Sequence, residues 1–175
     1  MNRMTNHKWY VLQVKTGYEE KVANALNNRG YTTTIPIENR MIRRGGKWIE
    51  QPYIVFPGYV FVYLDYSWAK YYAMSGIFGV IKLLGGGHEP TPLSKNEAVF
   101  INRLSEFLIH PSVIEFSDNG SYKCVSGFLA DNKDKIIKIE RRYKRATVLV
   151  AIAGEEKQIK ISFTENKQTP DRTED

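Results

Sequence analysis

The segment Phe56-Pro57-Gly58-Tyr59-Val60-Phe61-Val62 decides the fold of this 175-residue chain. β-Branched and aromatic residues dominate the sequence from Tyr53 to Leu64, which predicts a β-strand. Pro57 and Gly58 interrupt the run, and the side chains that follow alternate between two faces. Both faces are apolar, which indicates a central strand that is covered on both sides.

Composition limits the classes of protein to which the chain can belong. Hydrophobic residues make up 42% and charged residues 25% of the sequence, as in a soluble globular protein of one or two domains. No stretch approaches the roughly 18 apolar residues of a membrane span. The segment from Met1 to Lys8 has no apolar signal core. We therefore expect a cytoplasmic protein with no membrane partner.

No residue pattern predicts catalysis or metal binding. The single cysteine, Cys124, cannot form an intrachain disulfide, and the histidines His7, His88 and His110 are scattered. Motifs of hydrolases, zinc proteases and phosphate-binding loops are missing from the sequence. The run Gly85-Gly86-Gly87 lacks the following lysine of a phosphate loop. The sequence therefore predicts a protein that is not an enzyme and needs no cofactor.

Residues 1–108 predict an α+β domain in which strands and helices alternate. Helices are expected after two capping-box patterns, Thr16-Gly17-Tyr18-Glu19 and Ser94-Lys95-Asn96-Glu97, and over Ser67 to Ser75. Besides the central strand, expected strands cover Trp9–Val14, Tyr31–Glu38 and Val80–Leu84, and Met41–Glu50 forms a hairpin that turns at Gly45-Gly46.

Turn-forming residues between positions 109 and 121, among them Pro111 and Gly120, predict a flexible linker between independent domains. Short strands are then expected over Tyr122–Val125, Lys135–Glu140, Ala146–Ala151 and Lys157–Phe163, which indicates a small antiparallel barrel over 122–168. The polar residues 169–175 predict a disordered tail.

The chain is basic, with a net charge of +6 and a pI near 9.3, which is typical of proteins with a polyanionic partner. Between Tyr122 and Phe163, ten Lys and Arg against five Asp and Glu give a net charge of +5. The cations concentrate in Arg141-Arg142-Tyr143-Lys144-Arg145, between two expected strands. Cations suit phosphates and an aromatic ring suits unpaired bases, so this turn is a candidate RNA-binding site.

Other cations extend this prediction. Lys123, Lys133, Lys135 and Lys138 are candidates to enlarge the RNA-binding surface, whereas the hairpin tip offers Arg43, Arg44 and Lys47 for contact with DNA. Each cluster also has a simpler interpretation as a solvated turn, because charged residues usually lie in such turns.

Several segments together resemble the NusG family of transcription factors along nearly the whole chain. They are Trp9–Leu12, Thr16–Glu19, Phe56–Val62, Gly76–Val80 and Pro90–Leu93, while Val125–Gly127 and Ile136–Arg142 resemble a KOW module. The resemblance implies an N-terminal NGN domain, an α+β sandwich that binds the clamp of bacterial RNA polymerase. It also implies a C-terminal KOW domain, an SH3-like barrel that recruits a second partner.

The resemblance assigns the polymerase contact to Phe56, Tyr59, Ile77 and Phe78. Two departures from housekeeping members stand out. Phe128, Asp131 and Asp134 replace a proline and two glycines of the KOW module, and Ala73-Met74 replace an Asn-Thr pair that reads non-template DNA. These departures and the arginine-rich turn make the chain resemble the LoaP group of antitermination factors, and imply a monomer that binds a leader RNA hairpin. Two alternatives remain. One is a housekeeping elongation factor, and the other is a KOW protein that binds RNA or the ribosome and has no polymerase role.

Overall fold

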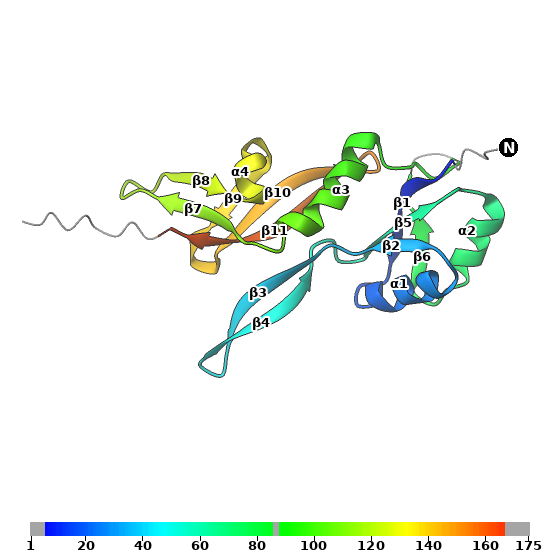
Figure 1. Ribbon diagram of the computed structural model, residues 1–175, viewed down its shortest axis with the longest axis horizontal. Coiled ribbons are helices and arrows are strands. Elements are labelled where there is room, and N and C mark those ends of the chain that lie inside the picture. Colours follow the sequence, from blue (N-terminus) through cyan, green and yellow to red (C-terminus); the bar gives the residue numbers. More distant parts are fainter. Residues whose placement is uncertain (1–5, 86–87, 167–175) are drawn as a thin grey trace, which may run out of the picture.

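The computed structural model describes residues 6–85 and 88–166 (Figure 1). One end of the molecule holds a sheet covered by two helices, and the other end holds a second sheet. A two-stranded hairpin projects from the first sheet and runs beside the second (Figure 1). In the part of the chain that the structure describes, no helix is long and apolar enough to cross a membrane.

The first sheet has the strand order β2-β5-β1-β6. Its strands are β1 (Lys8–Val14), β2 (Thr32–Thr34), β5 (Tyr59–Leu64) and β6 (Val80–Leu83). Strand β5 pairs with β1 on one side and with β2 on the other, both antiparallel. The prediction that the Phe56–Val62 segment leads into a central strand is therefore confirmed.

The two faces of this sheet pack against different parts of the molecule. Helices α1 (Glu19–Asn28) and α2 (Trp68–Ser75) cover one face, where Leu26 and Met74 pack in a cluster with Leu12 and Val62. Side chains of the opposite face, such as Val11 and Phe61, join a second cluster that also contains residues of α3 (Lys95–Phe107) and of the second sheet.

The two predicted capping boxes have different outcomes. At α3, Ser94 Oγ accepts from the Glu97 N–H and the Glu97 carboxylate accepts from the Ser94 N–H, as predicted. At α1 the prediction is wrong, because Glu19 is the first helical residue and its side chain is buried. Its two carboxylate oxygens accept from the N–H groups of Gly17 and Gly58, at 2.7 and 2.6 Å. Glu19 thus holds the turn that begins the central strand.

The predicted hairpin is longer than expected. Strands β3 (Ile37–Arg44) and β4 (Lys47–Ile54) pair along their whole length and turn at Gly45 and Gly46, both with positive φ. Such a turn matches the twist of the flanking strands and requires residues that tolerate positive φ. The single strand expected over Tyr31–Glu38 is instead split between β2 and β3, because Pro36 cannot donate a hydrogen bond to a neighbouring strand.

The second sheet has the order β8-β7-β11-β10-β9 and includes one parallel pair, β7 with β11. Its strands are β7 (Ser112–Phe116), β8 (Tyr122–Ser126), β9 (Ile136–Glu140), β10 (Arg145–Ile152) and β11 (Glu155–Glu165). A short helix, α4 (Phe128–Asp131), and two 3-10 turns, η1 (Lys133–Lys135) and η2 (Arg141–Tyr143), connect them. An α+β first half followed by a β-rich second half confirms the predicted fold class.

Strand β7 lies inside the range 109–121 for which a linker was predicted. Its central residue Ile114 is fully buried, and its pairing with β8 and β11 makes it an inner strand of the second sheet. The strand escaped prediction because it has only five residues and turn formers flank it on both sides. The predicted tail 169–175 lies outside the described residues.

The two halves of the molecule are in contact. The rings of Phe100 on α3 and Phe128 on α4 lie 5.8 Å apart, and Lys135 Nζ lies 5.4 Å from the Phe100 ring centroid. One apolar cluster contains Phe56 and Phe61 of the first half together with Ile152 and Ile161 of the second. This packing differs from the independent domains that the sequence predicts.

Candidate nucleic-acid interface

The basic turn is built on a rigid base. Strands β9 and β10 pair at Glu140 and Arg145, and η2 closes the connection between them. Lys144 has a left-handed backbone with φ 51°, and its carbonyl accepts a hydrogen bond from the Phe163 N–H of β11 at 3.2 Å. The side chains of the turn are therefore presented from a fixed backbone rather than from a loose loop.

The cations of this turn are not equivalent. Arg141 donates two hydrogen bonds to the Glu165 carboxylate, at 3.0 and 3.3 Å, and its guanidinium lies 4.4 Å from the Phe116 ring centroid. The bond to Glu165 raises the pKa of Arg141. Arg142 instead lies over the neighbouring ring of Tyr143, at 5.8 Å. Arg142, Tyr143 and Lys144 are all exposed, so they are the members of the turn best placed to meet a ligand.

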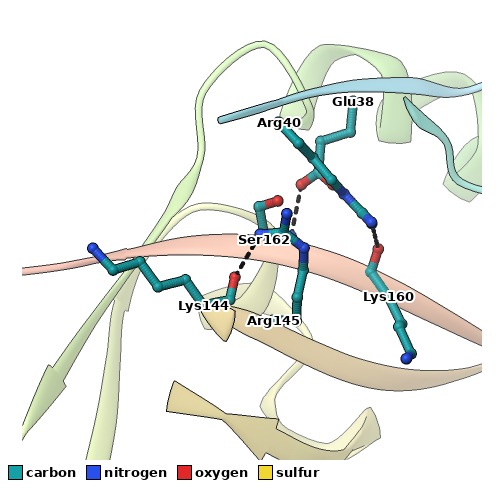
Figure 2. A network of polar contacts seen from close by, with 6 residues as sticks. All are labelled: Glu38, Arg40, Lys144, Arg145, Lys160 and Ser162. Carbon is teal, nitrogen blue, oxygen red and sulfur yellow. Dashed lines mark hydrogen bonds and ion pairs between the residues drawn. The ribbon is translucent and has the colours of Figure 1, made fainter. Parts of the chain in front are cut away.

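Arg145 belongs to a network that joins the hairpin to the second sheet (Figure 2). Its Nη1 donates to the Lys144 carbonyl at 3.0 Å. Burial, and then the nearby charge of Arg40, lower the pKa of Arg145. Arg40 forms a buried ion pair with Glu38 at 2.6 Å and donates to the Lys160 carbonyl.

The remaining lysines predicted to bind RNA are spread over the second half. Lys138 lies on β9 beside the turn and pairs with Glu140 at 3.2 Å. Lys133 and Lys135 lie on η1, at the opposite end of β9 from the turn. Lys123 is exposed on β8. Of these four lysines, only Lys138 therefore lies next to the basic turn.

The hairpin contributes residues that the sequence did not single out. Trp48 is 62% exposed and pairs across the hairpin with Arg43, so the two side chains share one face. A cleft of about 460 Å³ separates this face from the basic turn. Its lining is Asn39, Met41, Trp48, Pro111, Arg142, Tyr143, Lys144, Arg145, Ser162, Phe163 and Thr164. The overlooked signal was a tryptophan and a methionine in a strongly polar hairpin.

The four residues assigned to the polymerase contact lie in two places. Phe56 is only 2% exposed and packs edge-on against Phe61, and Tyr59 is half-buried with Lys157 Nζ 5.0 Å from its ring centroid. Ile77 belongs to the cluster on the helix-covered face of the sheet. Phe78 is 71% exposed and lies against Tyr18. Lys157 of the second half therefore lies over Tyr59, Phe56 is buried in the apolar cluster that both halves share, and Phe78 is accessible.

Comparison with known proteins agrees with this architecture. Residues 7–102 match the family model described as NusG, transcription termination factor nusG. The chain is 28% identical to the transcription termination/antitermination protein NusG of Bacillus subtilis, over 90% of this chain and 96% of that protein. The protein of the same name from Halalkalibacterium halodurans is 29% identical, with the same coverage.

A solved structure described as domain interaction in Thermotoga maritima NusG has a similar fold, with a TM-score of 0.51 and 21% identity. The match covers 90% of this chain and 94% of that one. The family model spans more than half of the chain, and the relatives match nearly its whole length. The protein therefore belongs to the NusG family of transcription termination and antitermination factors, with an NGN domain followed by a KOW domain.

Proposed function

We propose that this protein is a specialised antitermination factor, most similar to the LoaP group, that promotes read-through of terminators. In this proposal the NGN domain binds the clamp of bacterial RNA polymerase and the KOW domain binds a leader RNA. It acts in the cytoplasm, where transcription takes place. The observation that carries the proposal is the exposed group Arg142, Tyr143 and Lys144 on a rigid turn. Two cations beside an aromatic ring suit a phosphate chain with unpaired bases.

The departures from housekeeping members support a specialised role. Phe128 is fully buried against Phe100, so the residue that replaces the usual proline helps to dock the two domains. Met74 is also fully buried, and an apolar core side chain offers nothing that reads a DNA base. A partner contact that needs the usual proline at position 128, or a DNA contact that needs a polar residue at position 74, is therefore disfavoured in this protein.

The proposed polymerase contact has a structural requirement. Because Phe56 is buried in the cluster that both domains share and Tyr59 lies against Lys157, their use by polymerase requires the tip of β10 and β11 to separate from the first sheet. Lys157 contributes to the closed arrangement through its position over Tyr59. Phe78 can make contact without such a change. The hairpin-tip residues Arg43, Arg44 and Lys47 remain proposed contacts for non-template DNA.

A transcription assay with purified bacterial RNA polymerase tests the proposal. The template carries a terminator, with or without the leader of the operon in which the protein is encoded. We expect read-through to increase only when the leader is present, and Arg142→Ala to reduce that increase. Read-through that does not depend on the leader would indicate a housekeeping elongation factor instead. A chain that neither binds polymerase nor alters termination would refute the proposal.

A further inference from the structure

The cleft between the hairpin and the basic turn is formed by both domains. The hairpin side supplies Met41 and Trp48, and the KOW side supplies the basic turn and residues of β11. Its volume of about 460 Å³ lies within the range of roughly 300–1,000 Å³ that is usual for small-ligand sites. A space of this size fits one or two nucleobases.

Two exposed aromatic rings line this cleft from opposite sides. Trp48 is 62% exposed and Tyr143 is 64% exposed, although both lie in otherwise polar elements. Large exposed rings that gather at one place on the surface indicate a binding site for a partner. Flat rings of this kind are platforms on which unpaired bases stack, with little dependence on sequence. Tyr143 also lines the neighbouring hollow beside Arg40, so its ring lies between the two.

The charge of the cleft has one sign. Arg142, Lys144 and Arg145 line it, and among the described residues of its lining there is no carboxylate. Arg43 shares the hairpin face of Trp48, and so does Glu50, which pairs with Met41, but neither side chain lines the cleft itself. Ser162 also lines the cleft, although its hydroxyl oxygen is buried. Cations flanking stacking rings match a phosphate chain whose bases are unpaired.

We propose that the cleft binds unpaired bases of RNA, stacked on Trp48 and Tyr143, with adjacent phosphates held by Arg142 and Lys144. The inference rests on the proposed RNA-binding function and adds the NGN hairpin to the RNA site. RNA rather than duplex DNA is favoured, because protein recognition of RNA commonly uses loop bases splayed onto aromatic side chains. RNA binding and the docking of the two domains are then coupled, since each side of the cleft comes from a different domain.

The test is a titration of the full chain with a labelled RNA hairpin whose loop consists of unpaired adenines. The matched variants are Trp48→Ala, Trp48→Phe and Trp68→Ala, because Trp68 is exposed on α2 at the far side of the first sheet. We expect Trp48→Ala to weaken binding by at least about fivefold and Trp48→Phe to retain most of it. Trp68→Ala should bind like the wild type. RNA should quench tryptophan fluorescence in the wild type, and this quenching should be lost in Trp48→Phe.

The outcomes separate this inference from the proposed function. A wild-type chain that binds no RNA refutes both. Suppose that Arg142→Ala weakens binding, whereas Trp48→Ala and Trp48→Phe bind like the wild type and Trp48→Phe still shows quenching. This result would overturn the proposed role of the cleft and leave the proposed RNA-binding function standing. Equal affinity for the adenine hairpin and for a fully paired RNA, or for the same hairpin made of DNA, would overturn the assignment to unpaired RNA.

Discussion

The carboxylate of Glu38 accepts a hydrogen bond from the backbone N–H of Ser162 at 2.7 Å, across 124 residues of sequence. The same carboxylate forms the buried ion pair with Arg40, which itself donates to the Lys160 carbonyl (Figure 2). One acidic side chain of the NGN hairpin therefore fixes that hairpin against β11 of the KOW domain. This attachment holds the hairpin beside the basic turn, where the cleft lies.

Replacement of Glu38 should detach the hairpin. Glu38→Ala leaves the Arg40 guanidinium buried without its partner, a change that typically costs about 3–5 kcal/mol. We expect a loss of that size in the free energy of unfolding, measured by denaturant titration with circular dichroism. Glu50→Ala removes an exposed carboxylate of the same hairpin and should change stability little. Equal stability of the two variants would show that the Glu38 network does not hold the domains together.

Glu19 should be essential for the turn before the central strand. Glu19→Ala leaves the N–H groups of Gly17 and Gly58 without their acceptor, and the loss at the buried Gly58 alone should cost about 1–3 kcal/mol. The adjacent Glu20 is exposed, so Glu20→Ala is the matched control. Thermal unfolding should show a clearly lower midpoint for the Glu19 variant only. Similar midpoints would contradict the role given to its carboxylate.

Much of the fold was predictable because local patterns decide it. The apolar alternation after Tyr59 predicts the central strand, and Ser94 with Glu97 predicts the start of α3. The failures involve long-range contacts. Glu19 follows Thr16 at capping-box spacing, yet one of its carboxylate oxygens accepts from a glycine 39 positions away. Strand β7 is recognisable only through its partners β8 and β11, which no local pattern reveals.

The candidate site was only half predictable. A run of cations around Tyr143 is visible in the sequence, and the structure presents it on a rigid turn. The sequence does not show that Arg141 forms an ion pair with Glu165, or that Trp48 lies across a cleft from Tyr143. These relationships depend on how two domains dock. Docking in turn depends on buried pairs such as Glu38 with the Ser162 N–H, whose members are distant in sequence.

Cys124 should act as a reporter of opening of the second sheet. Its side chain is buried, and burial raises the pKa of its thiol, so the reactive thiolate is scarce near neutral pH. We expect iodoacetamide to alkylate the folded protein slowly and the unfolded protein rapidly, with a rate that increases as the pH rises. Mass spectrometry of timed samples measures this directly, because the chain has one cysteine. Fast labelling under native conditions would contradict the buried position.

The two domains should unfold together. The shared apolar cluster and the Phe100–Phe128 contact link α3 to the KOW domain. Strand β7 within residues 109–121 is paired on both sides, which protects backbone bonds from proteases. We expect one calorimetric transition and slow proteolysis between 112 and 116. Two separate transitions, with early cleavage inside β7, would instead support independent domains joined by a flexible linker.

The salt dependence of RNA binding tests the central claim, that the basic turn is an RNA-binding surface, most directly. The full chain, Arg142→Ala and the control Arg103→Ala, an exposed arginine of α3, are titrated with RNA at several salt concentrations. If Arg142 contacts a phosphate, its loss should weaken binding and reduce the slope of log affinity against log salt by about 0.7. Arg103→Ala should match the wild type. Identical affinities and slopes for all three proteins would contradict the account.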